Sequence, residues 1–161
     1  MTDGRPAAGR RGTRAVLRDR TFWGAFLLGV AAMAAVDEIV FHQLLGWHHF
    51  YDGSTLRVGL LTDGLLHAFE LVAAVAGVFL LLDARRTGGV QGRVAGAGLG
   101  VGAGLFQLWD GVVDHKVLRL HQVRYDVELL PYDLAWNLGG LALLVVGIAL
   151  TLVAARRPAA G

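Results

Sequence analysis

Acidic and histidine residues lie inside hydrophobic segments of this sequence that are long enough to cross a membrane. Four such segments cover about residues 21–45, 59–82, 94–118 and 133–154, and each reaches the ~20 residues that a helix needs to span ~30 Å of hydrocarbon. Open strands cannot satisfy their backbone in lipid, so helices are predicted. A charged side chain there costs at least about 2.5–3.5 kcal/mol on insertion scales and persists where it is paired, hydrated or used. The pattern predicts an all-α fold, a four-helix transmembrane bundle with a polar site.

The composition agrees with a membrane protein. Of the 161 residues 55% are hydrophobic and 17% are charged, and the mean hydropathy is +0.52. The net charge of +2 comes largely from arginines near the termini and in one loop, which gives no support for nucleic-acid binding. The chain has no cysteine, which excludes disulfides, iron–sulfur clusters, thiolate zinc sites and cysteine nucleophiles. The expected environment is therefore the lipid bilayer.

The distribution of arginine predicts the orientation. Residues 1–20 are arginine-rich and are predicted to form a disordered basic cytoplasmic tail, and residues 156–161 a second cytoplasmic tail. The loop after the second segment is also basic, whereas the first and third loops are not, so both termini are predicted inside. Residues 21–155 then form a multi-pass domain of the plasma (inner) membrane. Ala32-Met33-Ala34 could imitate a signal cleavage site, but the polar stretch that follows in helical register favours an uncleaved helix.

With this orientation, the acidic and histidine residues of all four segments lie in the outer half of the bilayer. Each segment carries a polar pair at the i, i+4 spacing, which places both side chains on one helix face. The four pairs are Glu38 and His42, Asp63 and His67, Asp110 and Asp114, and Asp133 and Asn137. Facing helices build metal sites in bundle cores in this way. Nitrogen and oxygen donors without sulfur suit zinc, iron, manganese or copper(II).

Alternating glycines open the third segment, from Gly96 to Gly104. No strand is predicted before them, so they do not indicate a dinucleotide-binding loop, and small residues at i, i+4 instead favour close packing of membrane helices. One face of this segment is small at its inner end and polar at its outer end: Gly96, Gly100, Ala103, Gln107, Asp110 and Asp114. A bundle that is tight at the cytoplasmic end and opens into an outward cavity is expected.

A purely structural polar network is the competing interpretation. Buried polar side chains can hold membrane helices together, each bond contributing about 0.6–2 kcal/mol, and this accounts well for Gln107 and Asn137. It accounts poorly for five carboxylates at one depth, because like charges repel unless a cation or a proton intervenes. His48 and His49 lie among aromatic residues and fit an interfacial aromatic belt as well as they fit a metal site. His121 fits a plain loop.

Several motifs in combination resemble one family. They are Val-Asp37-x-Ile-Val-x-His42-Gln43-Leu-Leu-x-Trp47-His48-His49, then Asp63-Gly64-x-x-His67, then Asp110-Gly111-x-x-Asp114-His115 with His121 beyond. The chain resembles, over about residues 22–150, the small four-helix bacterial membrane proteins of domain-of-unknown-function family 2243. Glu38 stands where the family pattern has glycine. The resemblance implies metal or haem handling, and respiratory oxidase assembly as its setting.

These observations lead to one set of expected site residues. The expected metal ligands are Asp37, His42, Asp63, His67, Asp114 and His115. The residues expected to support them are Glu38, Gln43, Gln107, Asp110, Asp133 and Asn137. The outer loops offer three further candidate ligands, His48, His49 and His121.

The expected function is metal binding at an outward-facing site of histidines and carboxylates. Three alternatives stay open: a metal-dependent membrane hydrolase in which an open coordination position activates water, a haem-binding or proton-relay protein, and the structural network. Whether the protein is an enzyme is left undecided. A second copy of the chain or a respiratory assembly factor is the protein partner that these alternatives suggest.

Overall fold

The structure is a computed structural model that describes residues 12–156, and this part of the chain is helical apart from its loops. After a short helix, α1 (Thr13–Leu17), four long helices follow one another. They are α2 (Arg20–Val36) continued by η1 (Asp37–Leu44), α3 (Leu56–Thr87), α4 (Gly92–Leu108) continued by η2 (Trp109–Val117), and α5 (Leu129–Ala155). The all-α prediction is confirmed, and the two labels η mark π-helical turns.

Three of these helices are long and apolar enough to cross a membrane: Arg20–Leu44, Leu56–Thr87 and Leu129–Ala155. Large apolar side chains remain exposed along them, for example Leu71 and Phe79 on α3, which are 64% and 67% exposed. Such a surface is unfavourable in water and is what a lipid-facing helix presents. The chain is therefore an integral membrane protein with several apolar helices.

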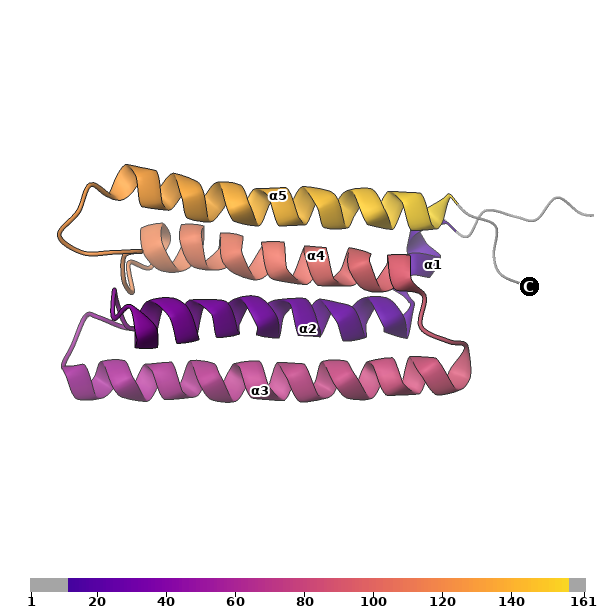
Figure 1. Cartoon of the computed structure of the whole chain (residues 1–161), viewed down its shortest axis with the longest axis horizontal. Coiled ribbons are helices and arrows are strands. Elements are labelled where there is room, and N and C mark those ends of the chain that lie inside the picture. The colour runs from indigo at the N-terminus through magenta and orange to yellow at the C-terminus, as the bar shows by residue number, and fades with distance from the viewer. Residues whose placement is uncertain (1–11, 157–161) are drawn as a thin grey trace, which may run out of the picture.

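The four long helices lie side by side in the order α3, α2, α4, α5 (Figure 1). Helix α2 packs against both α3 and α4, and α4 packs against both α2 and α5. Within the described residues the outer helices α3 and α5 do not pack along each other, so the arrangement is a row rather than a bundle closed around one core. The inner pair, α2 and α4, consequently carries the buried site.

The glycines of α4 explain the row. Successive alternate residues of a helix point about 200° apart, so the glycines face two neighbours. A Cβ at Gly98 or Gly102 would stand 2.1 Å from the backbone carbonyl oxygen of a residue in α2. A Cβ at Gly104, on the other side, would stand 2.4 Å from the backbone nitrogen of Leu144 in α5. The sequence predicted one small-residue face, and α4 has two.

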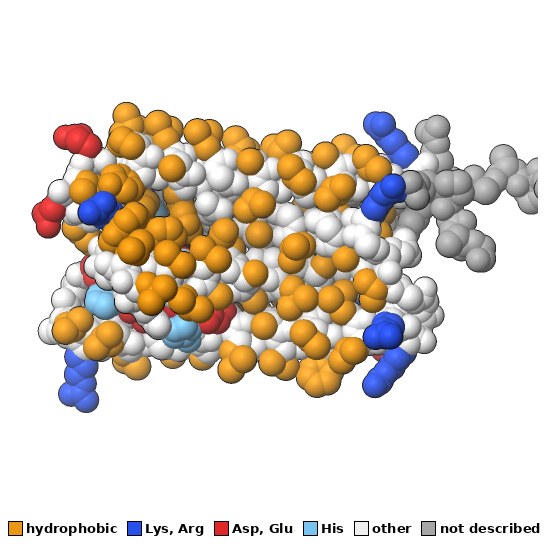
Figure 2. Space-filling view, viewed as in Figure 1, with side chains coloured by type: hydrophobic (Ala, Val, Ile, Leu, Met, Phe, Trp, Pro, Cys, Tyr) orange, Lys and Arg blue, Asp and Glu red, His pale blue; other side chains and the backbone are white. Residues whose placement is uncertain are grey.

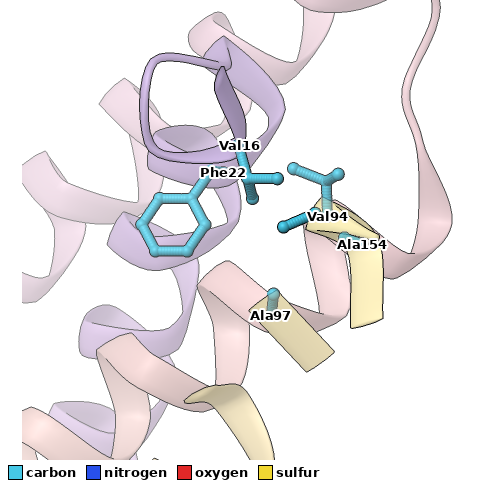
Figure 3. Close-up of a cluster of buried hydrophobic side chains, with 6 residues drawn as sticks. Val16, Phe22, Val94, Ala97 and Ala154 are labelled. Atoms are coloured by element: carbon cyan, nitrogen blue, oxygen red, sulfur yellow. The ribbon is translucent and has the colours of Figure 1, made fainter. Parts of the chain in front are cut away.

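A hydrophobic cluster closes the end of the row at which the described chain begins and ends (Figure 3). Val16 of α1 is fully buried there against Phe22, Val94 and Ala154, and the backbone N–H of Gly12 donates to the carbonyl of Ala155 at 3.1 Å. Residues Thr13–Leu17 are thus helical although they fall in the predicted disordered tail, because Val16 gains this apolar contact. Of the two predicted tails, residues 1–11 and 157–161 lie outside the described residues.

Charge is distributed unevenly between the two ends of the row (Figure 2). Lys and Arg side chains are visible at both ends, with more of them at the end where the termini lie, and the histidine side chains visible on this face lie at the opposite end. Helix α3 ends with Arg85 and Arg86 in its last turn, which places these two residues at the terminus end. The acidic and histidine residues of the site are thus concentrated at the end opposite the termini.

Candidate metal centre

Two π-helical segments shape the site. The backbone N–H of Leu45 donates to Val40 at 2.9 Å, and that of Leu118 donates to Val113 at 2.7 Å, each bond closing an i to i+5 turn. Turns of this kind are frequent at functional sites. They bring residues five apart onto one face, whereas the sequence prediction assumed the i, i+4 spacing of an α-helix.

The π register pairs an aspartate with a histidine in each segment. His42 Nε2 lies 3.6 Å from Asp37 Oδ2, and His115 Nε2 lies 3.1 Å from Asp110 Oδ2. The predicted pair of Glu38 and His42 is also in contact, at 2.7 Å between Oε2 and Nδ1. Asp110 was expected to support the ligands and instead touches the imidazoles directly.

The two pairs belong to an internal repeat of the sequence. Asp37, His42 and His48 recur as Asp110, His115 and His121, each 73 residues further on (110 minus 37, 115 minus 42 and 121 minus 48). Helices α3 and α5, which begin at Leu56 and Leu129, are offset by the same number of residues. The row is therefore built from two equivalent helix pairs, α2–α3 and α4–α5, which meet where α2 packs against α4.

The loop after each π segment turns back into the protein. Gly46 and Arg119 are equivalent residues and both adopt a left-handed conformation, with φ of 57° and 55°. Glycine takes this conformation freely, whereas arginine requires the surrounding structure to hold it there. The turn returns His48 and His121 to the interior, where they are 5% and 1% exposed.

Each half of the repeat holds a histidine of the other half. His48 Nδ1 donates to the carbonyl of Val123 at 2.8 Å, and His121 Nδ1 donates to the carbonyl of Phe50 at 2.9 Å. The two rings stack with centroids 4.5 Å apart and planes 5° apart. Because both Nδ1 atoms carry the proton, both Nε2 atoms keep a lone pair for a cation.

Four imidazoles and two carboxylates meet at this place, and we call them the histidine centre: Asp37, His42, His48, Asp110, His115 and His121. Two groups of three within it have ligand atoms that lie within 4.8 Å of one another. These groups are His42 with His48 and His121, and Asp110 with His115 and His121. All six side chains are buried.

Several polar atoms of the histidine centre lack a hydrogen-bond partner within the described residues. They include Nε2 of His42, Nε2 of His48 and Oδ2 of Asp110. In addition, Nε2 of His115 and Nε2 of His121 face each other at 2.9 Å. Buried polar groups are normally paired, because leaving one unpaired costs about 1–3 kcal/mol. Cations bound among these atoms would give them the partners that they lack.

The pKa values of the two loop histidines are shifted in opposite directions. Burial lowers the pKa of His48 to about 2, with a further lowering from the neighbouring imidazoles of His121 and His42, so His48 is neutral. Burial also lowers the pKa of His121, but hydrogen bonding and charge attraction from Asp110 outweigh it and the net pKa is raised. The Asp110 carboxylate thus favours a positive charge next to it.

Further predicted residues surround the His42 side of the centre. Asp63 lies 3.1 Å from His42 Nδ1, contacts His49 Nδ1 at 2.6 Å and accepts the backbone N–H of Phe50 at 2.7 Å. Glu38 and Asp63 therefore fix the orientation of His42 and direct its Nε2 into the centre, as carboxylates commonly do for metal-bound histidines.

His67 lies at the edge of the site. Its Nδ1 contacts Glu70 at 2.6 Å and its Nε2 stands 3.5 Å from Glu38, with the side chain 35% exposed. Gln43 hydrogen bonds to both Glu38 and His67. His67 is thus one residue removed from the centre, since Glu38 separates it from His42.

The remaining predicted residues have other contacts. Asp133 pairs with Lys116 at 2.7 Å, Asn137 donates to the carbonyl of Asp133 at 2.9 Å, and Gln107 donates to the carbonyl of Trp136 at 2.8 Å. The bonds of Gln107 and Asp133 join α4 and η2 to α5, whereas that of Asn137 lies within α5. The structural interpretation therefore fits Gln107 but not Asn137.

An apolar cavity of about 470 Å³ lies beside the centre, between α3 and α4. Asp114 lines it together with Phe50, Leu66, Phe106 and Trp109. Asp114 is buried and was predicted as a ligand. The cavity places its carboxylate next to a space that a small molecule can occupy.

Sequence reasoning underrated His48 and His121, which it placed only among outer-loop candidates. Asp and His at spacings of five and six residues, repeated at an offset of 73, are the signal that marks both (110 minus 37 gives the offset). An internal repeat of this kind is visible in the sequence alone.

Comparison with known proteins identifies a family for the chain. No curated protein and no solved structure matches the chain. The model of one family does match, over residues 24–154, and its description is a predicted membrane protein, DUF2243. This range takes in both halves of the repeat and the whole histidine centre, so the chain belongs to the DUF2243 family of predicted membrane proteins.

Proposed function

We propose that this membrane protein binds a transition-metal ion at the histidine centre, with zinc, iron, manganese or copper(II) as the candidates. The observation that supports this most is the arrangement of its imidazoles. Nδ1 of His42, His48 and His121 each faces an oxygen acceptor, which leaves the Nε2 lone pair of each ring to coordinate a metal. The buried carboxylates of Asp37 and Asp110 complete a nitrogen and oxygen ligand set.

The close packing of the rings favours an ion over haem. Two axial histidines of a haem stand on opposite sides of the macrocycle, with nitrogens about 4 Å apart for metal–nitrogen bonds of ~2.0–2.1 Å. The Nε2 atoms of His115 and His121 are 2.9 Å apart, and the His48 and His121 rings stack directly at 4.5 Å. A flat macrocycle has no space between either pair.

Metal analysis of the purified protein tests the proposal. Protein prepared without chelators is expected to carry at least one of the four metals per chain, and metal-stripped protein is expected to take it up again. The visible spectrum is expected to lack a Soret band. Protein that keeps its helical spectrum and binds none of the four metals would contradict the proposal and favour the structural network.

We propose further that all four long helices cross the plasma membrane with both termini in the cytoplasm. The arginines at the terminus end of the row support this, because positive residues stay on the cytoplasmic side. The histidine centre then lies in the outer half of the bilayer, open to metal supplied from outside the cell.

Reporter fusions test this orientation. Fusions after Gly53 and after Pro131 are expected to be active outside the cytoplasm, and a fusion after Gly88 inside it. Two reporters of opposite compartment specificity, alkaline phosphatase and a fluorescent protein, are fused at the same points so that each location is read twice. The reverse pattern would place the centre on the cytoplasmic side.

A further inference from the structure

We infer that the histidine centre holds two metal ions, one for each half of the internal repeat. This inference rests on the proposed function and adds to it the number of ions and their ligands. One ion is assigned to Asp110, His115 and His121. The other is assigned to His42 and His48, with Asp37 beside them.

The repeat supplies two equivalent ligand sets. In the second half, His115 Nε2 and His121 Nε2 lie 3.1 Å and 3.4 Å from the two oxygens of Asp110. In the first half, His42 Nε2 and His48 Nε2 lie 3.6 Å and 3.9 Å from the two oxygens of Asp37. Each aspartate thus faces both histidines of its own half, one with each oxygen.

The spread of the ligand atoms is too large for one ion. Opposite ligands of a single ion stand about 4.2 Å apart when each bond is ~2.0–2.1 Å, so all six residues would lie within 4.8 Å of one another. Instead, the groups whose ligand atoms lie within 4.8 Å of one another contain three residues each. Two of these groups lie in the histidine centre, and His121 belongs to both. Two neighbouring positions, with His121 between them, fit this pattern.

The charge of the region also calls for two ions. Five buried carboxylates surround the centre: Asp37, Glu38, Asp63, Asp110 and Asp114. The ion pairs that they form within residues 12–156 are with histidines. One divalent ion compensates two negative charges and two ions compensate four, which suits a buried cluster of this kind. Paired ions ~3.5–4 Å apart are a common arrangement in proteins.

Metal stoichiometry of matched variants tests the inference. His42 and His115 are equivalent residues of the two halves, so His42→Ala and His115→Ala are each expected to reduce zinc from two ions per chain to one. The double variant is expected to bind none. His67→Ala, at the edge of the site, is the control and is expected to retain both ions, and circular dichroism checks that every variant keeps its helices.

A second readout uses copper(II). Two copper ions in adjacent positions couple magnetically, so the loaded parent is expected to give a half-field electron paramagnetic resonance signal that both single variants lack. A parent with one ion per chain would overturn the inference and leave the proposed function standing. A parent with none would overturn both. A folded single variant that loses both ions would overturn the assignment of one ion to each half.

Discussion

Replacing His121 with alanine is expected to reduce metal affinity more than any other single change. His121 belongs to both compact ligand groups, and its ring also stacks on His48. Loss of a residue that only supports a ligand costs about 10–100-fold in affinity, and loss of His121 should exceed 100-fold. Competition with a chromogenic chelator measures this directly on purified protein.

The control for His121→Ala is His49→Ala. His49 contacts Asp63 at 2.6 Å and supports His42 only through that carboxylate, so a loss of at most about 100-fold is expected. Thermal unfolding of the metal-free variants separates affinity from folding. Equal affinities for His121→Ala and the parent would mean that the histidine centre is not the binding site.

Adding one methyl group at Gly102 is expected to separate helices α2 and α4. A Cβ there would stand 2.1 Å from the carbonyl oxygen of Phe26, a backbone atom that cannot move without displacing its helix. Overpacking of this kind costs about 1–3 kcal/mol and occasionally more, and the contact lies in the centre of the row. Gly102→Ala is therefore expected to lower the midpoint of thermal unfolding strongly and to reduce metal content with it.

Gly64→Ala provides the matched control on α3, because nothing lies within 4 Å of the added Cβ. This variant should unfold at or above the temperature of the parent, since alanine favours a helix over glycine by about 1 kcal/mol. If Gly102→Ala and Gly64→Ala were equally stable, close backbone contact would not hold α2 against α4. The explanation of the row by the glycines of α4 would then fail.

Much of the fold could be predicted from hydrophobic segments and their polar interruptions. The predicted second and fourth segments, 59–82 and 133–154, lie inside α3 (Leu56–Thr87) and α5 (Leu129–Ala155). The row was harder to predict, because the sequence indicated one small-residue face of α4, with Gly96, Gly100 and Ala103 at its inner end. Residues two apart on a helix point to nearly opposite faces, so Gly102 packs against α2 and Gly104 packs against α5.

The candidate site could be predicted in part. Asp37, His42 and His115 were named as ligands and lie in the histidine centre, whereas His67 lies beyond Glu38. The α-helical spacing predicted Glu38 as the partner of His42. The π turns place Asp37 beside His42 as well. Such turns depend on packing that a local sequence pattern does not contain. For the same reason His48 was placed only among the outer-loop candidate ligands.

The two halves of the repeat lie in one polypeptide and differ at some equivalent positions. A site on the axis between two identical helix pairs is what a homodimer builds from one short chain, since each copy supplies the same aspartate and two histidines. Joining the copies in one polypeptide frees equivalent positions to diverge. Glu38 and Asp63 of the first half now correspond to Gly111 and Trp136 of the second, and the Trp136 ring fills the space beside Gly111. One flank of the centre is thus acidic and the other aromatic, an asymmetry that no pair of identical subunits can encode.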